Sequence, residues 1–210
     1  MDPFDVFVRI VLYFTIFAVI GYVVEALNSL LHEKRISNRG FLFGPYLPIY
    51  GFAGIMMIGV WQCMPHDNYF LTFVVAMLIG AGLEYATSYI LEKIFHLRWW
   101  DYSKWHKYTI NGRICLRNTI IFGIVGLVFC YVLLPAMNNA INLIPVGVQI
   151  AIAIIMTVIY TIDFVASSYA NLKVKNMEEF SKAVGDQTRE IKKNAKKIIK
   201  SAVKKKRRRK

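Results

Sequence analysis

The sequence predicts an all-α integral membrane protein, a bundle of five transmembrane helices followed by a basic tail. Three observations support this fold class. Hydrophobic residues make up 56% of the 210 residues, and the mean hydropathy is +0.43, which is too apolar for an ordinary soluble domain. Several apolar runs exceed the roughly 18 residues that indicate a bilayer span. Clusters of Lys and Arg recur on one side of these runs only, as they do at a membrane.

The apolar runs place all five spans in a transmembrane domain formed by residues 1–172. The expected spans are residues 6–31, 47–64, 69–95, 114–137 and 144–170. The segment between the first two spans is expected to be non-helical, because Gly and Pro interrupt the helical pattern at positions 40, 44, 45 and 48. Short turns are expected at the positions 64–68, 111–113 and 138–142.

Two glycines of the fourth span, Gly123 and Gly126, are candidates for close helix packing. Small residues allow the backbones of two membrane helices to approach each other. We therefore expect another helix to cross the fourth span at this point.

The positive charges predict the orientation of the bundle. The turns at 64–68 and 138–145 contain no Lys or Arg, whereas the first loop, the loop at 98–113 and the tail are basic. Positive loops are retained in the cytoplasm, so we expect the N-terminus outside and the C-terminus inside the cell membrane. A cleavable signal peptide is not expected, because the N-terminus has acidic residues in place of a basic region.

The tail, residues 173–210, carries most of the net charge. Its 16 Lys and Arg residues and four acidic residues contribute +12 of the formal +13, which leaves +1 for the rest of the chain. The apolar spacing in this segment fits an amphipathic helix that lies on an anionic inner leaflet. The alternative is a solvated tail that only enforces the orientation. Nucleic-acid binding is not expected, because no aromatic side chains accompany the terminal basic run.

Acidic residues lie inside the expected spans, where charge is costly and usually functional. Glu25, Glu84 and Asp163 occupy polar faces of the first, third and fifth spans. Such carboxylates could bind a cation, relay protons or hold a cationic head group. The structural alternative is that they accept ion pairs from arginines of the neighbouring loops and lock these loops to the bundle.

The connection at 98–113 combines aromatic and basic residues. Trp99, Trp100 and Tyr102 suit head-group depth at a membrane interface, but this explains Asp101 poorly. A functional interpretation is a pocket whose arginines bind phosphate or carboxylate oxygens; the aromatic rings could instead flank a quaternary amine. The candidate anion-binding residues are Arg39, Arg98 and Arg113.

No metal, cofactor or catalytic residue is assigned from the sequence. The four His and three Cys residues lack metal-ligand spacing, and the cysteines at 63, 115 and 130 are expected to be free thiols. Walker A, G-x-S-x-G, G-x-G-x-x-G and H-E-x-x-H motifs do not occur. Transport driven by ATP would therefore require a motor on another subunit.

Several stretches resemble one bacterial membrane-protein family, the CmpB-like ABC-transporter permeases, also called ABC-transporter type IV. The stretches are GYVVE at 21–25, NRGFLFGP at 38–45, PIYG at 48–51, LEYATSYILE at 83–92, RWWDYS at 98–103, NGRI at 111–114 and FG at 122–123. The resemblance covers about residues 20–126 and excludes the fifth span and the tail. It implies a small multi-pass membrane protein that acts in transport.

We therefore expect a transporter or permease component with a cytosol-facing polar cavity for a small cationic or amphiphilic solute. The residues expected to line the cavity are Glu25, Arg39, Glu84, Arg98, Asp101, Asn111, Arg113 and Asp163. Expected partners are anionic lipids at the tail, and either copies of the chain or other membrane or ATPase subunits. Two alternatives stay open: an enzyme that modifies a lipid or isoprenoid at the inner leaflet, with Glu84 or Asp101 as acid or base, and a non-catalytic scaffold.

Overall fold

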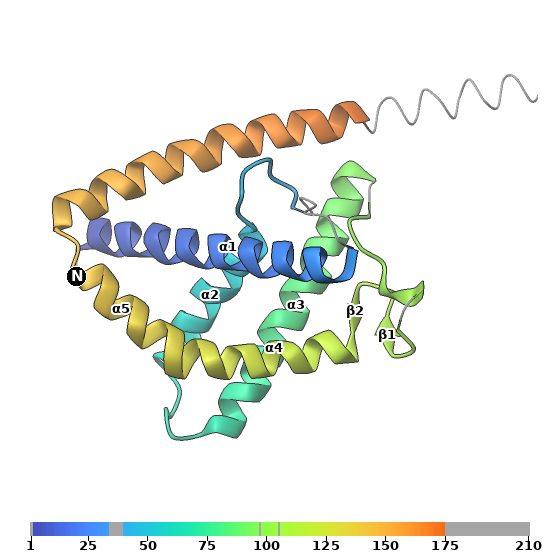
Figure 1. Cartoon of the computed structure of the whole chain (residues 1–210), viewed down its shortest axis with the longest axis horizontal. Helices are drawn as coiled ribbons and strands as arrows, with labels where there is room; N and C mark the ends of the chain where they lie inside the picture. Colours follow the sequence, from blue (N-terminus) through green and yellow to red (C-terminus); the bar gives the residue numbers. More distant parts are fainter. Residues whose placement is uncertain (1, 34–39, 97, 105, 175–210) are drawn as a thin grey trace, which may run out of the picture. The chain divides into compact units, whose positions relative to one another are not determined.

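The computed structural model describes residues 2–33, 40–96, 98–104 and 106–174, and most of these residues are helical (Figure 1). The elements in chain order are α1 (Pro3–Glu33), α2 (Pro48–Trp61), α3 (Tyr69–Phe95), η1 (Tyr102–Lys104), β1 (Thr109–Ile110), β2 (Ile114–Cys115), α4 (Leu116–Val128), η2 (Phe129–Leu133) and α5 (Leu134–Asn142). A last helix covers Val146–Val174. The chain divides into two units, Met1–Ser167 and Ser168–Lys210, and all the packing described below belongs to the first.

Four helices are long and apolar enough to cross a membrane, which agrees with the predicted all-α membrane class. They are Pro3–Leu31, Tyr69–Phe95, Leu116–Asn142 and Val146–Val174. Each has 27 residues or more, about 40 Å of helix at 1.5 Å per residue, against a hydrocarbon core of about 30 Å. The third predicted span, 69–95, has the same limits as α3.

The predicted span at 47–64 is the exception, because α2 has only 14 residues, or about 21 Å. Pro48 begins the helix, as its fixed φ and missing N–H favour, and the chain turns after Trp61. The structure therefore does not confirm a count of five spans. The orientation stays a prediction, and the predicted tail beyond Val174 lies outside the described residues.

The segment at 40–47, which precedes α2, is non-helical, as its two glycines and its proline predict. The backbone N–H of Leu47 donates to the carbonyl oxygen of Ala18 in the middle of α1 (2.9 Å). Non-helical backbone at membrane depth requires such a protein partner. The loop is thereby attached to the bundle, and it directs Tyr50 of α2 toward α1.

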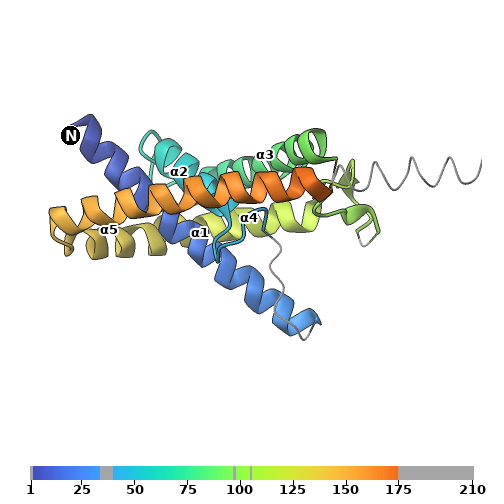
Figure 2. The same ribbon diagram turned by 90° about the horizontal axis from the view of Figure 1, so that it is seen from above.

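Glycines mediate the close contacts of the bundle, which is shown from a second direction in Figure 2. Between α3 and α4, a Cβ at Gly126 would lie 2.1 Å from the Cβ of Ala76, and one at Gly123 would lie 2.5 Å from the Phe73 ring. The prediction that these two glycines allow close packing is confirmed. Between α1 and α2, Gly54 receives the ring of Phe17 in the same way.

Substitution of Gly126 by Ala is expected to destabilise the bundle, because the new methyl group overlaps Ala76. Overpacking of this kind costs about 1–3 kcal/mol. Thermal unfolding in detergent should show a lower midpoint for Gly126→Ala than for the control Gly82→Ala, since a Cβ at Gly82 meets nothing within 4 Å. Equal midpoints would contradict this packing of α3 against α4.

The predicted span at 114–137 continues to Asn142, so the predicted turn at 138–142 is wrong. Two of the three asparagines in this segment bind α1: Asn138 accepts a hydrogen bond from the Tyr13 hydroxyl, and Asn142 accepts one from Arg9 (3.0 Å). Pro135 has no N–H to continue the regular ladder. The helix widens into the π turn η2 just before it, and the N–H of Leu134 bonds to the carbonyl of Phe129.

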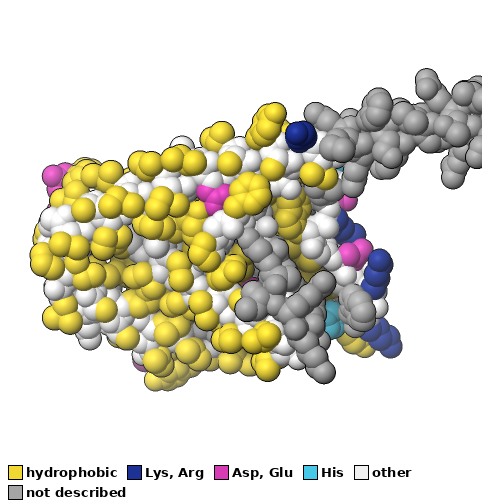
Figure 3. All heavy atoms as spheres, turned by 45° about the horizontal axis from the view of Figure 1, so that its top comes forward, with side chains coloured by type: hydrophobic (Ala, Val, Ile, Leu, Met, Phe, Trp, Pro, Cys, Tyr) yellow, Lys and Arg dark blue, Asp and Glu magenta, His cyan; other side chains and the backbone are white. Residues whose placement is uncertain are grey.

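The outer surface of the helices is apolar. Figure 3 shows hydrophobic side chains over most of the visible helical surface, while most Lys, Arg and His side chains in view gather at one end. Leu78 and Ile162 are examples of large aliphatic side chains that are more than 60% exposed. Apolar exposure on this scale is typical of helices that face lipid.

Candidate functional site

The predicted site residues fall into three polar clusters. Arg39 lies outside the described residues. The other seven separate into Asp163 alone, the pair Glu25 and Glu84, and the loop group Arg98, Asp101, Asn111 and Arg113. Whether these residues line one cavity, as the sequence predicted, stays a prediction.

Asp163 binds the loop at 40–47. Its carboxylate accepts hydrogen bonds from the backbone N–H groups of Phe43 (3.0 Å) and Gly44 (2.8 Å) and from the Tyr46 hydroxyl (2.5 Å). A fourth donor is Ser167, one turn further along the same helix (2.8 Å). Four donors satisfy a carboxylate, and the arrangement fixes the loop to the last helix.

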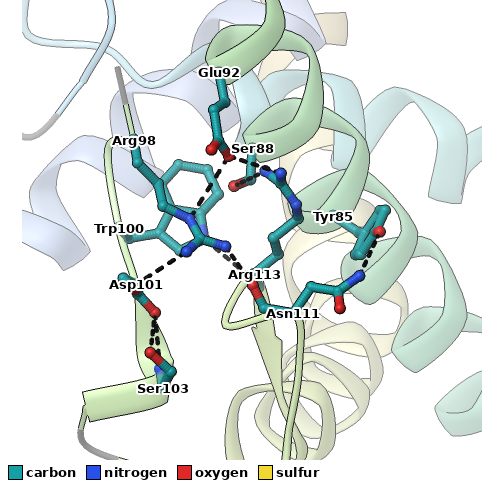
Figure 4. A network of polar contacts seen from close by, with 9 residues as sticks. All are labelled: Tyr85, Ser88, Glu92, Arg98, Trp100, Asp101, Ser103, Asn111 and Arg113. Atoms are coloured by element: carbon teal, nitrogen blue, oxygen red, sulfur yellow. Dashed lines mark hydrogen bonds and ion pairs between the residues drawn. The ribbon is translucent and has the colours of Figure 1, made fainter. Parts of the chain in front are cut away.

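Arg113 attaches the connection at 98–115 to α3 (Figure 4). Its guanidinium lies 2.7 Å from Glu92 Oε2 and donates to Ser88 Oγ at 3.0 Å. It also lies over the rings of Tyr85 and Tyr89, at 5.7 and 5.5 Å from their centroids. The arginine side chain is 12% exposed, so this is a shielded, multiply bonded ion pair.

Arg98 and Asp101 order the same connection from its other end. Arg98 Nη1 lies 3.1 Å from Asp101 Oδ2, and Arg98 Nη2 donates to the carbonyl of Asn111. Asp101 Oδ1 accepts from both the hydroxyl and the backbone N–H of Ser103. These two hydrogen bonds from Ser103, with the nearby Arg98 charge, lower the pKa of Asp101, so the carboxylate remains ionised.

The turn at 111–113, predicted from Asn-Gly-Arg, closes a two-stranded hairpin of β1 and β2. Asn111 and Gly112 both have positive φ, 52° and 66°, as a type I′ turn requires. The N–H of Arg113 bonds to the carbonyl of Ile110 (3.0 Å). A Cβ at Gly112 would lie 2.3 Å from Asp101 Oδ1, so glycine is also needed for the approach of Asp101.

Glu84 lies on the buried face of α3, in line with the residues that bind Arg113. Glu84, Ser88 and Glu92 follow one another at i, i+4 and i+8, which places them on one side of the helix. Glu84 is 6% exposed and Ser88 is 4% exposed. The Tyr102 hydroxyl, from η1, donates to Glu84 Oε1 at 2.6 Å.

Glu25 of α1 is the second acid of this cluster. Its Oε1 accepts a hydrogen bond from the Tyr50 hydroxyl (2.8 Å), and Glu25, Tyr50 and Glu84 lie close enough to interact electrostatically. Burial and the adjacent Glu84 charge raise the pKa of Tyr102, so its hydroxyl keeps the proton that it donates. We name Glu25, Tyr50, Glu84 and Tyr102 the acidic cluster.

The acidic cluster contains no cation among the described residues. The predicted structural alternative is that the acids inside the spans pair with loop arginines. Among the described residues, Arg113 and Arg98 pair instead with Glu92, and Arg98 also pairs with Asp101, while Arg39 lies outside these residues. Glu84 Oε2 is buried, and the side chains that hydrogen-bond to Glu84 among the described residues, Tyr102 and Asn118, are neutral. A buried carboxylate that receives only neutral donors is costly to keep charged, so it favours the uptake of a proton or a cation.

Sequence reasoning did not assign the neutral donors to the site. Tyr50 and Tyr102 lie within the stretches that resemble the family, but their hydroxyl groups carry the contacts to the acids. Asn118, at the start of α4, also interacts with Glu84 and Tyr102. The signal that could have found them is general: a tyrosine hydroxyl next to an apolar run requires a polar partner.

These features define a multi-pass α-helical membrane protein with an acidic cluster inside its helical bundle. The family model described as "Putative ABC-transporter type IV" matches residues 12–168, and the chain belongs to this family. The match extends beyond the motif stretches and includes most of the last helix. No curated protein and no solved structure matches the chain. Family membership and the four apolar helices are consistent with a component of a membrane transporter.

Proposed function

We propose that this chain is the membrane-embedded component of a transporter and that its acidic cluster binds the positive charge of a small cationic or amphiphilic solute. The family and the membrane-length helices support the first part. The second part is supported by the side chains that surround Glu25 and Glu84. The water-filled cavity predicted around these residues stays a prediction, as do the subunit partners.

One observation carries the proposal: two carboxylates from different helices lie near each other with only neutral donors among the described residues. Two such groups repel each other in a medium of low dielectric constant. A bound cation, or a proton in its place, relieves the repulsion and neutralises the buried charge of Glu84. The tyrosine hydroxyls hold the two carboxylates in position for this role.

The polar face of α3 supports an opening on the predicted cytosolic side. Ser88 and Glu92 continue the line of Glu84 toward the connection at 98–113, about 12 Å along the helix at 1.5 Å per residue. The connection is basic, and basic loops face the cytoplasm. A solute would therefore reach Glu84 from the end of the bundle at which Arg98 and Arg113 lie.

The scaffold alternative is favoured for the loop group alone. Arg98, Asp101 and Arg113 bind one another, Glu92 or the backbone, which is what a purely structural role requires. These residues would then position Tyr102, and through it Glu84, rather than contact the solute.

Cation binding by the purified chain tests the proposal. The probes are Na⁺, guanidinium and tetramethylammonium chloride, titrated at constant ionic strength against the full chain in detergent, with N-methylglucamine as the bulky control. We expect saturable heat or a saturable rise in thermal midpoint with at least one probe. Responses that are linear and equal for all four cations would show only a non-specific effect of the salts and would refute a cation site.

A further inference from the structure

A second candidate site, which is basic and apolar where the first cluster is acidic, lies where the hairpin of β1 and β2 meets α4. The structure has a hollow of about 310 Å³ there, and its lining residues are His106, Lys107, Tyr108, Leu116, Arg117 and Ile120. None of these residues was predicted to bind a ligand. Half of them are basic or imidazole side chains and the others are aromatic or aliphatic, so the hollow has a cationic part and an apolar part.

The cationic part is available to an anion. Lys107 and Arg117 are exposed, and neither forms an ion pair with any residue in the described part of the chain. Lys107 lies 5.8 Å from the centroid of the Tyr108 ring. Arg117 is in the first turn of α4, where the free N–H groups of a helix add to the positive potential.

The apolar part continues along α4 as an exposed stripe. Leu116, Ile120, Ile124 and Val128 follow one another at intervals of four residues, and their exposed fractions are 52%, 41%, 53% and 48%. Residues at this spacing share one face of a helix. The stripe is about 18 Å long, and one leaflet contributes about 15 Å of hydrocarbon. An acyl chain of ordinary length matches it.

We propose that this hollow binds the phosphate of an anionic phospholipid, with an acyl chain laid along the α4 stripe. Lys107 and Arg117 contact the phosphate oxygens, and the exposed Tyr108 ring lies at head-group depth, where tyrosine is favoured. Two basic side chains without an ion pair in the described part of the chain, next to a leaflet-length apolar stripe, favour a lipid over a free phosphate. The site does not depend on the function proposed for the acidic cluster.

Photolabelling of the full chain in nanodiscs tests this proposal. The probes are phosphatidylglycerol and phosphatidylcholine, each with a diazirine in one acyl chain. We expect the phosphatidylglycerol label, mapped by mass spectrometry, on peptides that contain the α4 stripe, and much weaker labelling there by phosphatidylcholine. Equal labelling by the two lipids would overturn the proposal, because it would show annular lipid without head-group selection.

The double variant Lys107→Gln/Arg117→Gln removes the phosphate contacts. At subsaturating lipid we expect about 30-fold less stripe labelling by phosphatidylglycerol, the factor for two basic side chains near an anionic head group. The control Lys93→Gln/Lys104→Gln removes the same charge from residues outside the hollow and should leave labelling within twofold of the wild type. Unchanged labelling in the first variant would refute the site.

A competition experiment distinguishes a lipid head group from a soluble phosphate as the ligand. Glycerol phosphate in excess should not displace the phosphatidylglycerol label if the acyl chain contributes to binding. Complete displacement would show that the hollow is a site for soluble phosphate and would overturn the lipid proposal. The wild-type map does not use any variant, so the proposal remains falsifiable if a variant fails to fold.

Discussion

Substitution of Glu84 by Gln is expected to weaken cation binding by about 100-fold while the chain stays folded and membrane-inserted. A charge-assisted contact in a buried site contributes about 2–3 kcal/mol, and the amide removes the charge without removing the group. The glutamine carbonyl can still accept from Tyr102, and its NH₂ can donate to a neighbouring carboxylate. Titration calorimetry with the best cation probe, together with a thermal melt, measures both effects.

Glu92→Gln is the matched control, because it makes the same change on the same face of α3. Glu92 lies 2.7 Å from Arg113, so this variant should lose stability and retain binding, the reverse of Glu84→Gln. Glu25→Gln should also weaken cation binding, as Glu84→Gln does. Full cation binding by the Glu25→Gln/Glu84→Gln double variant would show that the acidic cluster is not the site.

Substitution of Arg113 by Gln is expected to release the connection at 98–115 from α3. The change leaves Glu92 without its closest cation and Ser88 without a donor, and it also removes the contacts with the two tyrosine rings. Breaking a buried ion pair costs about 3–5 kcal/mol. Glu92 is 38% exposed, so we expect about 2–3 kcal/mol here.

Hydrogen exchange should show where Arg113→Gln lowers the stability of the chain. The N–H groups of Tyr102, Arg113 and Leu116 are bonded within the connection and should exchange faster in Arg113→Gln. Arg113→Lys should recover only part of the protection, because an ammonium lacks the planar fork and the ring stacking. The control is Arg117→Gln in lipid-free detergent, which removes an exposed guanidinium four residues away. Equal protection in Arg113→Gln and wild type would contradict the attachment.

The sequence predicted the long helices well because length and apolar composition determine membrane spans. The limits of α3 agree with the prediction because both ends depend on local residues. The Asn68 side chain accepts a hydrogen bond from the N–H of Leu71 at the start, and His96 adopts a left-handed conformation at the end. The Asn111-Gly112 turn is equally local, since it depends on the φ preference of two residues. The packing of Gly123 and Gly126 followed from their size alone.

What could not be predicted depends on which residues meet in three dimensions. Helical spacing placed Glu84 on a polar face of its span, but could not show that its donor is Tyr102 or that Arg113 pairs with Glu92 instead. The turn predicted at 138–142 is wrong, because the partners of Asn138 and Asn142 on α1 were not visible in the sequence. The span that contains the short α2 was overestimated: it was predicted to reach residue 64, whereas the helix ends at Trp61, directly before the polar Gln62.

The clamp that Asp163 forms on the loop at 40–47 has a mechanical consequence. The loop leads directly into α2, whose Tyr50 donates to Glu25, so a continuous series of bonds links the middle of the last helix to one of the two acids. A shift of that helix would pull on Phe43 and Gly44, tilt the first turn of α2 and move the Tyr50 hydroxyl relative to Glu25. A movement of the last helix would thereby change the position of the donor to Glu25 in the acidic cluster.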